Sequence, residues 1–130
     1  MIRVRLVDDE PAIVEVLGLA LTENGLKVRI ASNGVRALDP VAQWRPDVVL
    51  SDWMMPLMDG GALARTLKSA PELAAIPIFI TSALHPAGNL PIDEFLQKPF
   101  GVSQLLRLIQ RHTLRRAAAS RCGRVNREGK

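Results

Sequence analysis

Residues 48–60 read VVLSDWMMPLMDG, and this stretch decides the fold. The run that ends at Ser51 is almost wholly apolar, which is typical of a strand covered on both faces of a parallel sheet. Asp52 follows this run and opens a loop. A carboxylate at the end of a buried strand is costly to desolvate, so it needs a partner. Polar residues at the ends of other strands could supply such a partner.

The rest of the chain alternates strand patterns with helical patterns. Runs rich in apolar and β-branched residues predict five strands, over residues 2–7, 27–31, 47–51, 77–82 and 93–97. Helical spacing predicts four helices: one from Pro11 to a stop at Asn24-Gly25, one at about 35–44 interrupted by Pro40, one at about 60–69, and one at about 102–113 whose extension to 119 is left open.

This alternation of strands and helices indicates βαβ units and a parallel sheet. Because crossovers are right-handed, few topologies remain. The doubly wound, flavodoxin-like order 2-1-3-4-5 brings the ends of the first and third strands together. We therefore predict an α/β fold of this order.

Polar side chains stand where these strands give way to loops. Asp8 and Asp9 end the first strand, Ser82 ends the fourth, and Lys98 follows the fifth. The carboxyl ends of parallel strands converge on one crevice. We expect these residues to share one site with Asp52.

Composition restricts the class of protein. The chain has 130 residues, which suggests one domain, and 48% of them are hydrophobic, too many for a disordered chain. No apolar stretch is long enough to span a bilayer, and Met1 leads directly into a strand pattern without a signal-peptide layout. We expect a soluble, cytoplasmic protein without a membrane partner. The one cysteine, Cys122, excludes an internal disulfide and a multi-cysteine metal site.

The net charge of +4 is unevenly distributed. Residues 1–112 carry 11 basic and 12 acidic side chains, a net charge of −1, whereas residues 113–130 carry +5. The high pI therefore belongs to the end of the chain. We predict a domain over residues 1–113 and a basic tail over residues 114–130, either disordered or continuing the last helix.

Taken together, the strand-end motifs resemble the receiver domain of two-component response regulators, the CheY-like family. The resemblance covers about residues 2–112 and rests on several motifs in the right order, namely Asp8-Asp9, SDWMMPLMDG around Asp52, Ser82-Ala83 and Lys98-Pro99-Phe100. It implies a response regulator that accepts a phosphoryl group from a histidine kinase or a phosphotransfer protein and then switches a protein–protein interaction surface. It also implies that the chain is no enzyme beyond the self-catalysed phosphorylation and dephosphorylation of Asp52.

The resemblance also implies a cofactor, Mg²⁺ or Mn²⁺. Asp52 would be the phosphoacceptor and, with Asp9, a direct metal ligand. Asp8 would bind the metal directly or through water, and the backbone carbonyl of Met54 would be a further ligand. These oxygen donors are the ones that hard divalent cations prefer.

The remaining roles that the resemblance implies concern the phosphoryl group and the switch. Lys98 would pair with the phosphoryl oxygens, and Ser82 would donate its hydroxyl to them, with Thr81 as the rival for that role. Ala83 is small and would leave the site accessible. Phe95 occupies the position of the family's switch aromatic, although a plain core role has about equal weight.

Each motif also has an ordinary interpretation when it is taken alone. The Asp8-Asp9 pair could be a turn before the acidic first turn of a helix, and Asp52 could be a helix cap. A rival enzyme class, the aspartate-nucleophile phosphatases of the haloacid-dehalogenase type, wants a second Asp where Met54 stands. A third hypothesis is a receiver-like interaction module that works independently of phosphate.

The chain departs from the receiver pattern between the fourth and fifth strands. Receivers usually place a helix, their fourth, between these two strands. Only residues 83–92 are available for it here, and Pro86, Gly88 and Pro91 fall within them. Because proline in a helix interior costs roughly 3 kcal/mol, we predict that this helix is shortened or missing. We expect no DNA-binding domain, because only a short tail follows residue 113. We also expect a downstream protein partner, which the sequence does not identify, and a dimer is possible.

Overall fold

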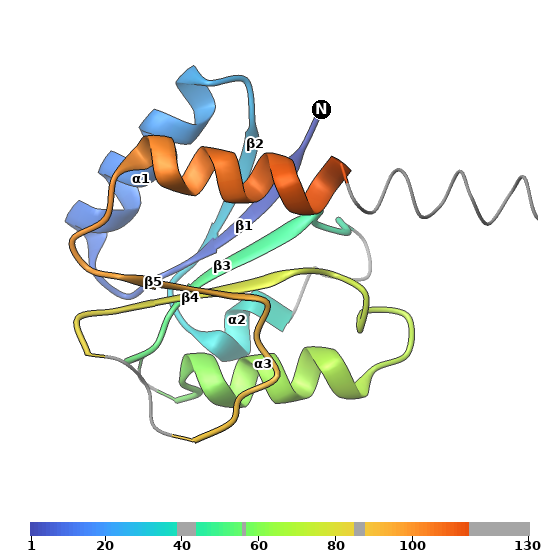
Figure 1. Ribbon diagram of the computed structural model, residues 1–130. Helices are drawn as coiled ribbons and strands as arrows, with labels where there is room; N and C mark the ends of the chain where they lie inside the picture. The colour runs from blue at the N-terminus through green and yellow to red at the C-terminus, as the bar shows by residue number, and fades with distance from the viewer. Residues whose placement is uncertain (39–43, 56, 85–87, 115–130) are drawn as a thin grey trace, which may run out of the picture.

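The computed structural model describes residues 1–38, 44–55, 57–84 and 88–114. A five-stranded parallel sheet in the order β2-β1-β3-β4-β5 forms its centre, which confirms the predicted topology (Figure 1). The strands follow the predicted ranges to within one residue at each end and are β1 (Arg3–Val7), β2 (Lys27–Ala31), β3 (Val48–Asp52), β4 (Ile78–Ser82) and β5 (Glu94–Gln97).

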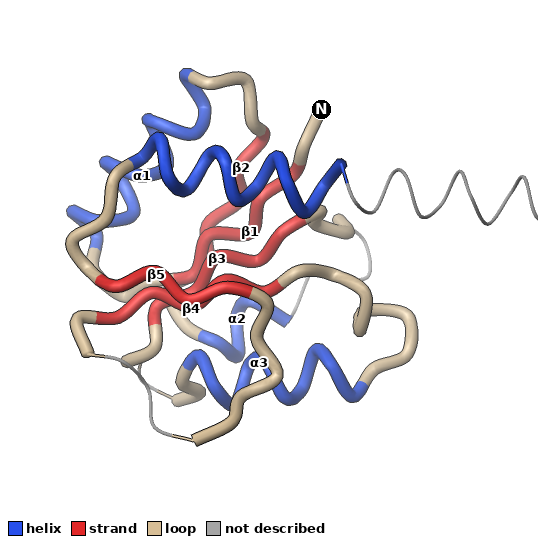
Figure 2. Tube along the Cα trace, viewed as in Figure 1, coloured by secondary structure: helices blue, strands red, loops and turns tan. Residues whose placement is uncertain are grey.

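Helices cover both faces of the sheet, as expected of a doubly wound fold (Figure 2). The labelled helices are α1 (Pro11–Glu23), α2 (Gly34–Leu38) and α3 (Gly60–Ser69). Residues 102–114 form a further helix. This helix and α1 pack on one face, and α2 and α3 on the other (Figure 1).

Local sequence signals set the ends of these helices. Pro11 is the first helical residue of α1, where its missing N–H is not needed. The same helix ends before Gly25, whose φ of +84° is a conformation that glycine adopts readily. The side chain of Asp59 caps α3 by accepting the backbone N–H of Ala62 at 2.8 Å.

The core has two apolar layers, one on each side of the sheet. All residues of β3 and β4 are buried, which agrees with their nearly unbroken apolar patterns. Phe79 of β4 is fully buried in the layer beneath α1 and the 102–114 helix, and its ring meets that of His112 at a centroid distance of 5.1 Å. The buried strands β3 and β4 therefore hold the residues at their ends, Asp52 and Ser82, in fixed positions.

Two predictions fall partly outside the described residues. The second helix was predicted over about 35–44, and its described part is α2, which ends at Leu38, while the interruption at Pro40 lies outside the described residues. Likewise, the predicted tail is described only at Leu114, in the last helix. Among the described residues, no helix has the length and apolar character to cross a membrane.

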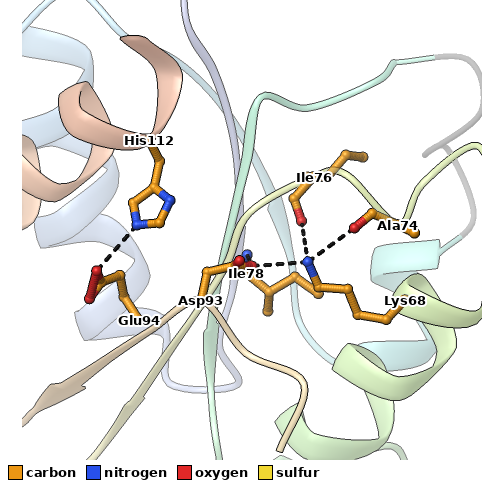
Figure 3. Close-up of polar contacts among 7 residues, drawn as sticks. All are labelled: Lys68, Ala74, Ile76, Ile78, Asp93, Glu94 and His112. Carbon is orange, nitrogen blue, oxygen red and sulfur yellow. Dashed lines mark hydrogen bonds and ion pairs between the residues drawn. The ribbon is translucent and has the colours of Figure 1, made fainter. Parts of the chain in front are cut away.

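The described residues between β4 and β5, 83–84 and 88–93, contain no helix, in agreement with the prediction that the usual helix between these strands is shortened or missing. Polar contacts from α3 hold the start of β4 and the approach to β5 in place (Figure 3). The ammonium of Lys68 donates to the carbonyls of Ala74 (3.1 Å) and Ile76 (3.2 Å) and to the carboxylate of Asp93 (3.0 Å). The same Asp93 oxygen accepts the backbone N–H of Ile78 at 2.7 Å.

We expect Asp93→Ala to lower the free energy of unfolding by about 2 kcal/mol, because it removes two charge-assisted hydrogen bonds. Asp93→Asn, which keeps an acceptor for the Ile78 N–H, should lose less. Urea unfolding of these variants, of Lys68→Met and of the double variant would give the coupling between the two side chains. Additive losses from Lys68→Met and Asp93→Ala would show that the pair does not stabilise the fold as a unit.

Candidate functional site

The strand ends bring four of the predicted site residues to one edge of the sheet. Asp52 is the last residue of β3 and Ser82 the last of β4. Asp8 follows β1, where its backbone N–H donates to Ala31 at 3.1 Å. Lys98 follows β5, and its backbone N–H donates to the carbonyl of Ser82 at 2.8 Å. All four strands run parallel, so these residues lie at the same end of the sheet.

Three carboxylates gather at this edge. Asp8, Asp9 and Asp52 each offer one oxygen, and these three oxygens lie within 4.8 Å of one another. Asp8 and Asp52 are buried, with 4% and 7% of their surface exposed, whereas Asp9 is exposed to solvent. Clustered carboxylate oxygens with one open side are a donor set that fits a small, hard divalent cation such as Mg²⁺.

Lys98 supplies the positive charge of the site. Its ammonium lies 2.9 Å from Asp52 Oδ1, in a hydrogen bond, and 3.8 Å from Asp8 Oδ2. Burial by itself would lower the pKa of Lys98. The hydrogen bond to Asp52 and the attraction of the nearby carboxylates outweigh burial, so the pKa is raised and the ammonium stays charged.

Asp8 occupies a less favourable environment. Burial, above all, raises the pKa of its carboxyl, and repulsion from Asp52 and Asp9 adds to this. The backbone N–H of Glu10, which donates to Asp8 Oδ1 at 2.9 Å, and the charge of Lys98 act in the opposite direction without cancelling the increase. Burial thus makes the charged form of Asp8 less favourable than it is in water, even with Lys98 nearby.

We expect Asp8→Asn to raise the free energy of unfolding at pH 7 by about 1 kcal/mol in buffer without divalent cations. A carboxyl whose pKa is raised on folding stabilises the native state below its unfolded pKa, and this contribution is lost as pH rises through the folded pKa. The variant escapes that loss. Urea unfolding of the natural chain and of Asp8→Asn between pH 3 and 8 measures the difference in their free energies of unfolding. A variant that is less stable than the natural chain at pH 7 would contradict the electrostatic account.

Two hydroxyls compete for the role assigned to Ser82. Ser82 is 7% exposed, and its Oγ accepts the backbone N–H of Leu84 at 3.3 Å. Thr81, 3% exposed, is the register partner of Asp52, and its carbonyl accepts the backbone N–H of Trp53 at 2.9 Å. Both residues therefore lie beside the end of β3, and the choice of Ser82 stays a prediction.

The other predicted residues lie around the site. Ala83 is exposed, next to Ser82, and the Met54 side chain is 69% exposed in the loop after β3. Phe95 lies on β5 as the register partner of Ile80 and packs, partly buried, against the core layer beneath α2 and α3. This position is compatible with both roles that the sequence left open for Phe95.

Two features of the loop after Asp52 were not predicted from the sequence. Gly60 was used only to start a helix, yet a Cβ at this position would lie 2.6 Å from the backbone oxygen of Asp52. The Gly-Gly pair directly after the loop was the available signal. Leu57 adopts a φ of +69°, which is unfavourable for a residue with a branched side chain, and nothing in the sequence signals it.

Comparison with known proteins identifies the family. The family model of the response regulator receiver domain matches residues 4–110. The chain belongs to this family, and it is thus a receiver domain of two-component signalling. Response regulator MprA of Mycobacterium sp. (strain KMS) is 37% identical over 111 residues, which are 81% of this chain and 47% of the relative. The chain spans about half the length of the curated relatives it matches.

Solved receiver structures have the same fold. The signal receiver domain of a signal transduction histidine kinase from Syntrophus aciditrophicus is 31% identical with a TM-score of 0.80, over 87% of this chain and 90% of that chain. The receiver domain of sensor histidine kinase PA1611 from Pseudomonas aeruginosa PAO1, with a magnesium ion coordinated in its active site cleft, is 27% identical with a TM-score of 0.77, over 85% and 96% of the two chains.

Proposed function

We propose that this receiver domain accepts a phosphoryl group on Asp52 from a histidine kinase or phosphotransfer protein, in a reaction that depends on Mg²⁺ or Mn²⁺. The observation that carries the proposal is the 2.9 Å contact between Lys98 and Asp52 beside two further carboxylates. A nucleophile that contacts a cation and lies among further carboxylates able to hold a metal ion is an arrangement suited to phosphoryl transfer.

Asp8, Asp9, Asp52 and the backbone carbonyl of Met54 would hold the metal ion. When bound, the ion would neutralise charge on the phosphoryl oxygens and relieve the repulsion among the carboxylates. The magnesium ion in the active site cleft of the Pseudomonas receiver domain supports this assignment. The three carboxylates also outnumber the ammonium of Lys98, and a bound cation would offset this excess of negative charge.

In the transfer step a carboxylate oxygen of Asp52 attacks the phosphorus of the donor. A new O–P bond forms, the P–N bond of a donor phosphohistidine breaks, and the imidazole leaves with the electron pair. Lys98 is positioned to pair with the phosphoryl oxygens as the group bonds to Asp52, because its ammonium already contacts that carboxylate. Ala83, small and exposed, leaves room for the donor to approach.

The modified Asp52 would be sensed by Ser82, whose hydroxyl donates to the phosphoryl group, and by Phe95, whose packing on the core layer would change with the loop after β4. A phenylalanine lacks a hydroxyl, so its states differ in packing alone.

The receiver unit comprises residues 1–113, and 114–130 form a basic tail. The surface that signals to a downstream protein lacks the usual fourth helix in its described part.

Intact mass after incubation with a small phosphodonor such as acetyl phosphate tests the proposal. We expect one added phosphate in the presence of Mg²⁺ and none with a chelator. If the mass does not increase under either condition, and a partner binds equally well with and without the phosphodonor, the phosphate-independent interaction module is favoured instead.

A further inference from the structure

Three arginines share one aromatic ring, away from the phosphoacceptor. Arg3 and Arg5 lie on β1, and Arg29 on β2 is the register partner of Arg5. Their guanidinium carbons lie 5.6, 5.3 and 4.9 Å from the centre of the Trp44 ring. Since alternate residues of a strand share a face, Arg3 and Arg5 project from the same face as Val7, the face that α2 and α3 cover.

The inner part of this cluster is buried and lacks acceptors. Arg5 is 3% and Trp44 is 5% exposed. Nε and Nη2 of Arg5 and Nε1 of Trp44 are buried, and they have no hydrogen-bond partner within the described part of the chain. All three atoms are donors, and neither side chain contains an acceptor of its own. The ring face offsets part of the positive charge but leaves the in-plane N–H groups unmatched.

No carboxylate of the described residues lies within ion-pair distance of Arg5. Asp47, the acidic residue that follows Trp44 most closely in the described chain, uses Oδ2 to accept the backbone N–H of Arg3 at 2.8 Å. Burial, followed by the charge of Arg29, lowers the pKa of Arg5. A buried cation without a counter-ion is strongly unfavourable, and such unmatched groups in native proteins often mark a bound ion.

We infer that Arg5, Arg29 and the indole N–H of Trp44 form a binding site for a small oxyanion of the phosphate class, either inorganic phosphate or a phosphate monoester. Such an anion carries several acceptor oxygens and matches the guanidinium fork. Arg3 and Arg29 are exposed, so the cluster borders solvent. The residues of this site are distinct from those around Asp52, so the inference goes beyond the proposed function.

The test uses Trp44 as its own reporter. In a Trp53→Phe background it is the remaining tryptophan of the chain. Inorganic phosphate is titrated at constant ionic strength without divalent cations, and a saturable change in fluorescence is expected. Arg29→Gln should weaken the affinity by about tenfold. Arg36→Gln removes the same charge from an exposed position on α2 and should leave the affinity unchanged. A parallel titration with glycerol phosphate shows whether a monoester is accepted as well as the free ion.

Three results would overturn the inference: no saturable response to phosphate, an equal loss in Arg29→Gln and Arg36→Gln, or a response that appears only in Asp39→Asn. The last would mean that the carboxylate of Asp39, which lies outside the described residues, already serves as the counter-ion. Arg5→Met is a second variant, expected to lose the response if it folds. Because Arg29 is exposed, Arg29→Gln keeps the test decisive even if Arg5→Met does not fold.

Discussion

Asp52→Asn is expected to abolish the Mg²⁺-dependent gain of one phosphate, so that no phosphorylated protein is detected. The amide cannot act as the nucleophile, and it removes the carboxylate that Lys98 contacts at 2.9 Å. The fold should remain, because Asn has nearly the same shape as Asp and the change lies at the last residue of β3. Intact mass spectrometry measures the gain, and circular dichroism checks the fold.

A matched control lies in the same loop. Asp59→Asn also converts a carboxylate to an amide, but Asp59 caps α3, and Asn is an equally good capping residue. We therefore expect Asp59→Asn to be phosphorylated like the natural chain. If Asp52→Asn still gains phosphate while its fold is intact, the acceptor lies elsewhere and the proposed function is wrong. If both variants lose the reaction, the loop and not the Asp52 carboxylate is responsible.

The topology could be predicted from the sequence because its signals are local and independent. The apolar runs of β3 and β4, the proline at the start of α1 and the glycine at its end each depend on a few neighbouring residues. Parallel strands then bring the polar residues at their ends together by geometry alone. For this reason Asp8, Asp52 and Lys98 could be placed at one site from the sequence alone.

Features that depend on the packing of distant segments could not be predicted. The contacts of Lys68 with Asp93 join positions 25 residues apart, and neither residue belongs to a motif. The ring of Trp44 meets arginines from two strands in the same way. Such contacts follow from three-dimensional packing and leave no periodic pattern in the sequence.

Gly60→Ala is expected to lower the free energy of unfolding by about 2–3 kcal/mol and to slow phosphorylation about tenfold or more. A Cβ at this position would lie 2.6 Å from the backbone oxygen of Asp52 and 3.2 Å from Cα of Trp53. Both atoms belong to the main chain, so neither can move aside as a flexible side chain would. The end of β3 must shift, and the carboxylate of Asp52 must shift with it. Urea unfolding and the rate of mass gain measure the two effects.

Gly18→Ala provides the control, because it makes the same chemical change in α1. The nearest atom to its Cβ is Cδ1 of Ile30, at 3.7 Å, which is an ordinary contact. Alanine is the better helix former, so this variant should be more stable by about 0.5–1 kcal/mol and should be phosphorylated at the normal rate. If Gly60→Ala instead behaved like Gly18→Ala, the close approach of α3 to Asp52 would not determine how the nucleophile is held. If Gly60→Ala lost stability but kept the normal rate, the start of α3 would support the fold without positioning Asp52.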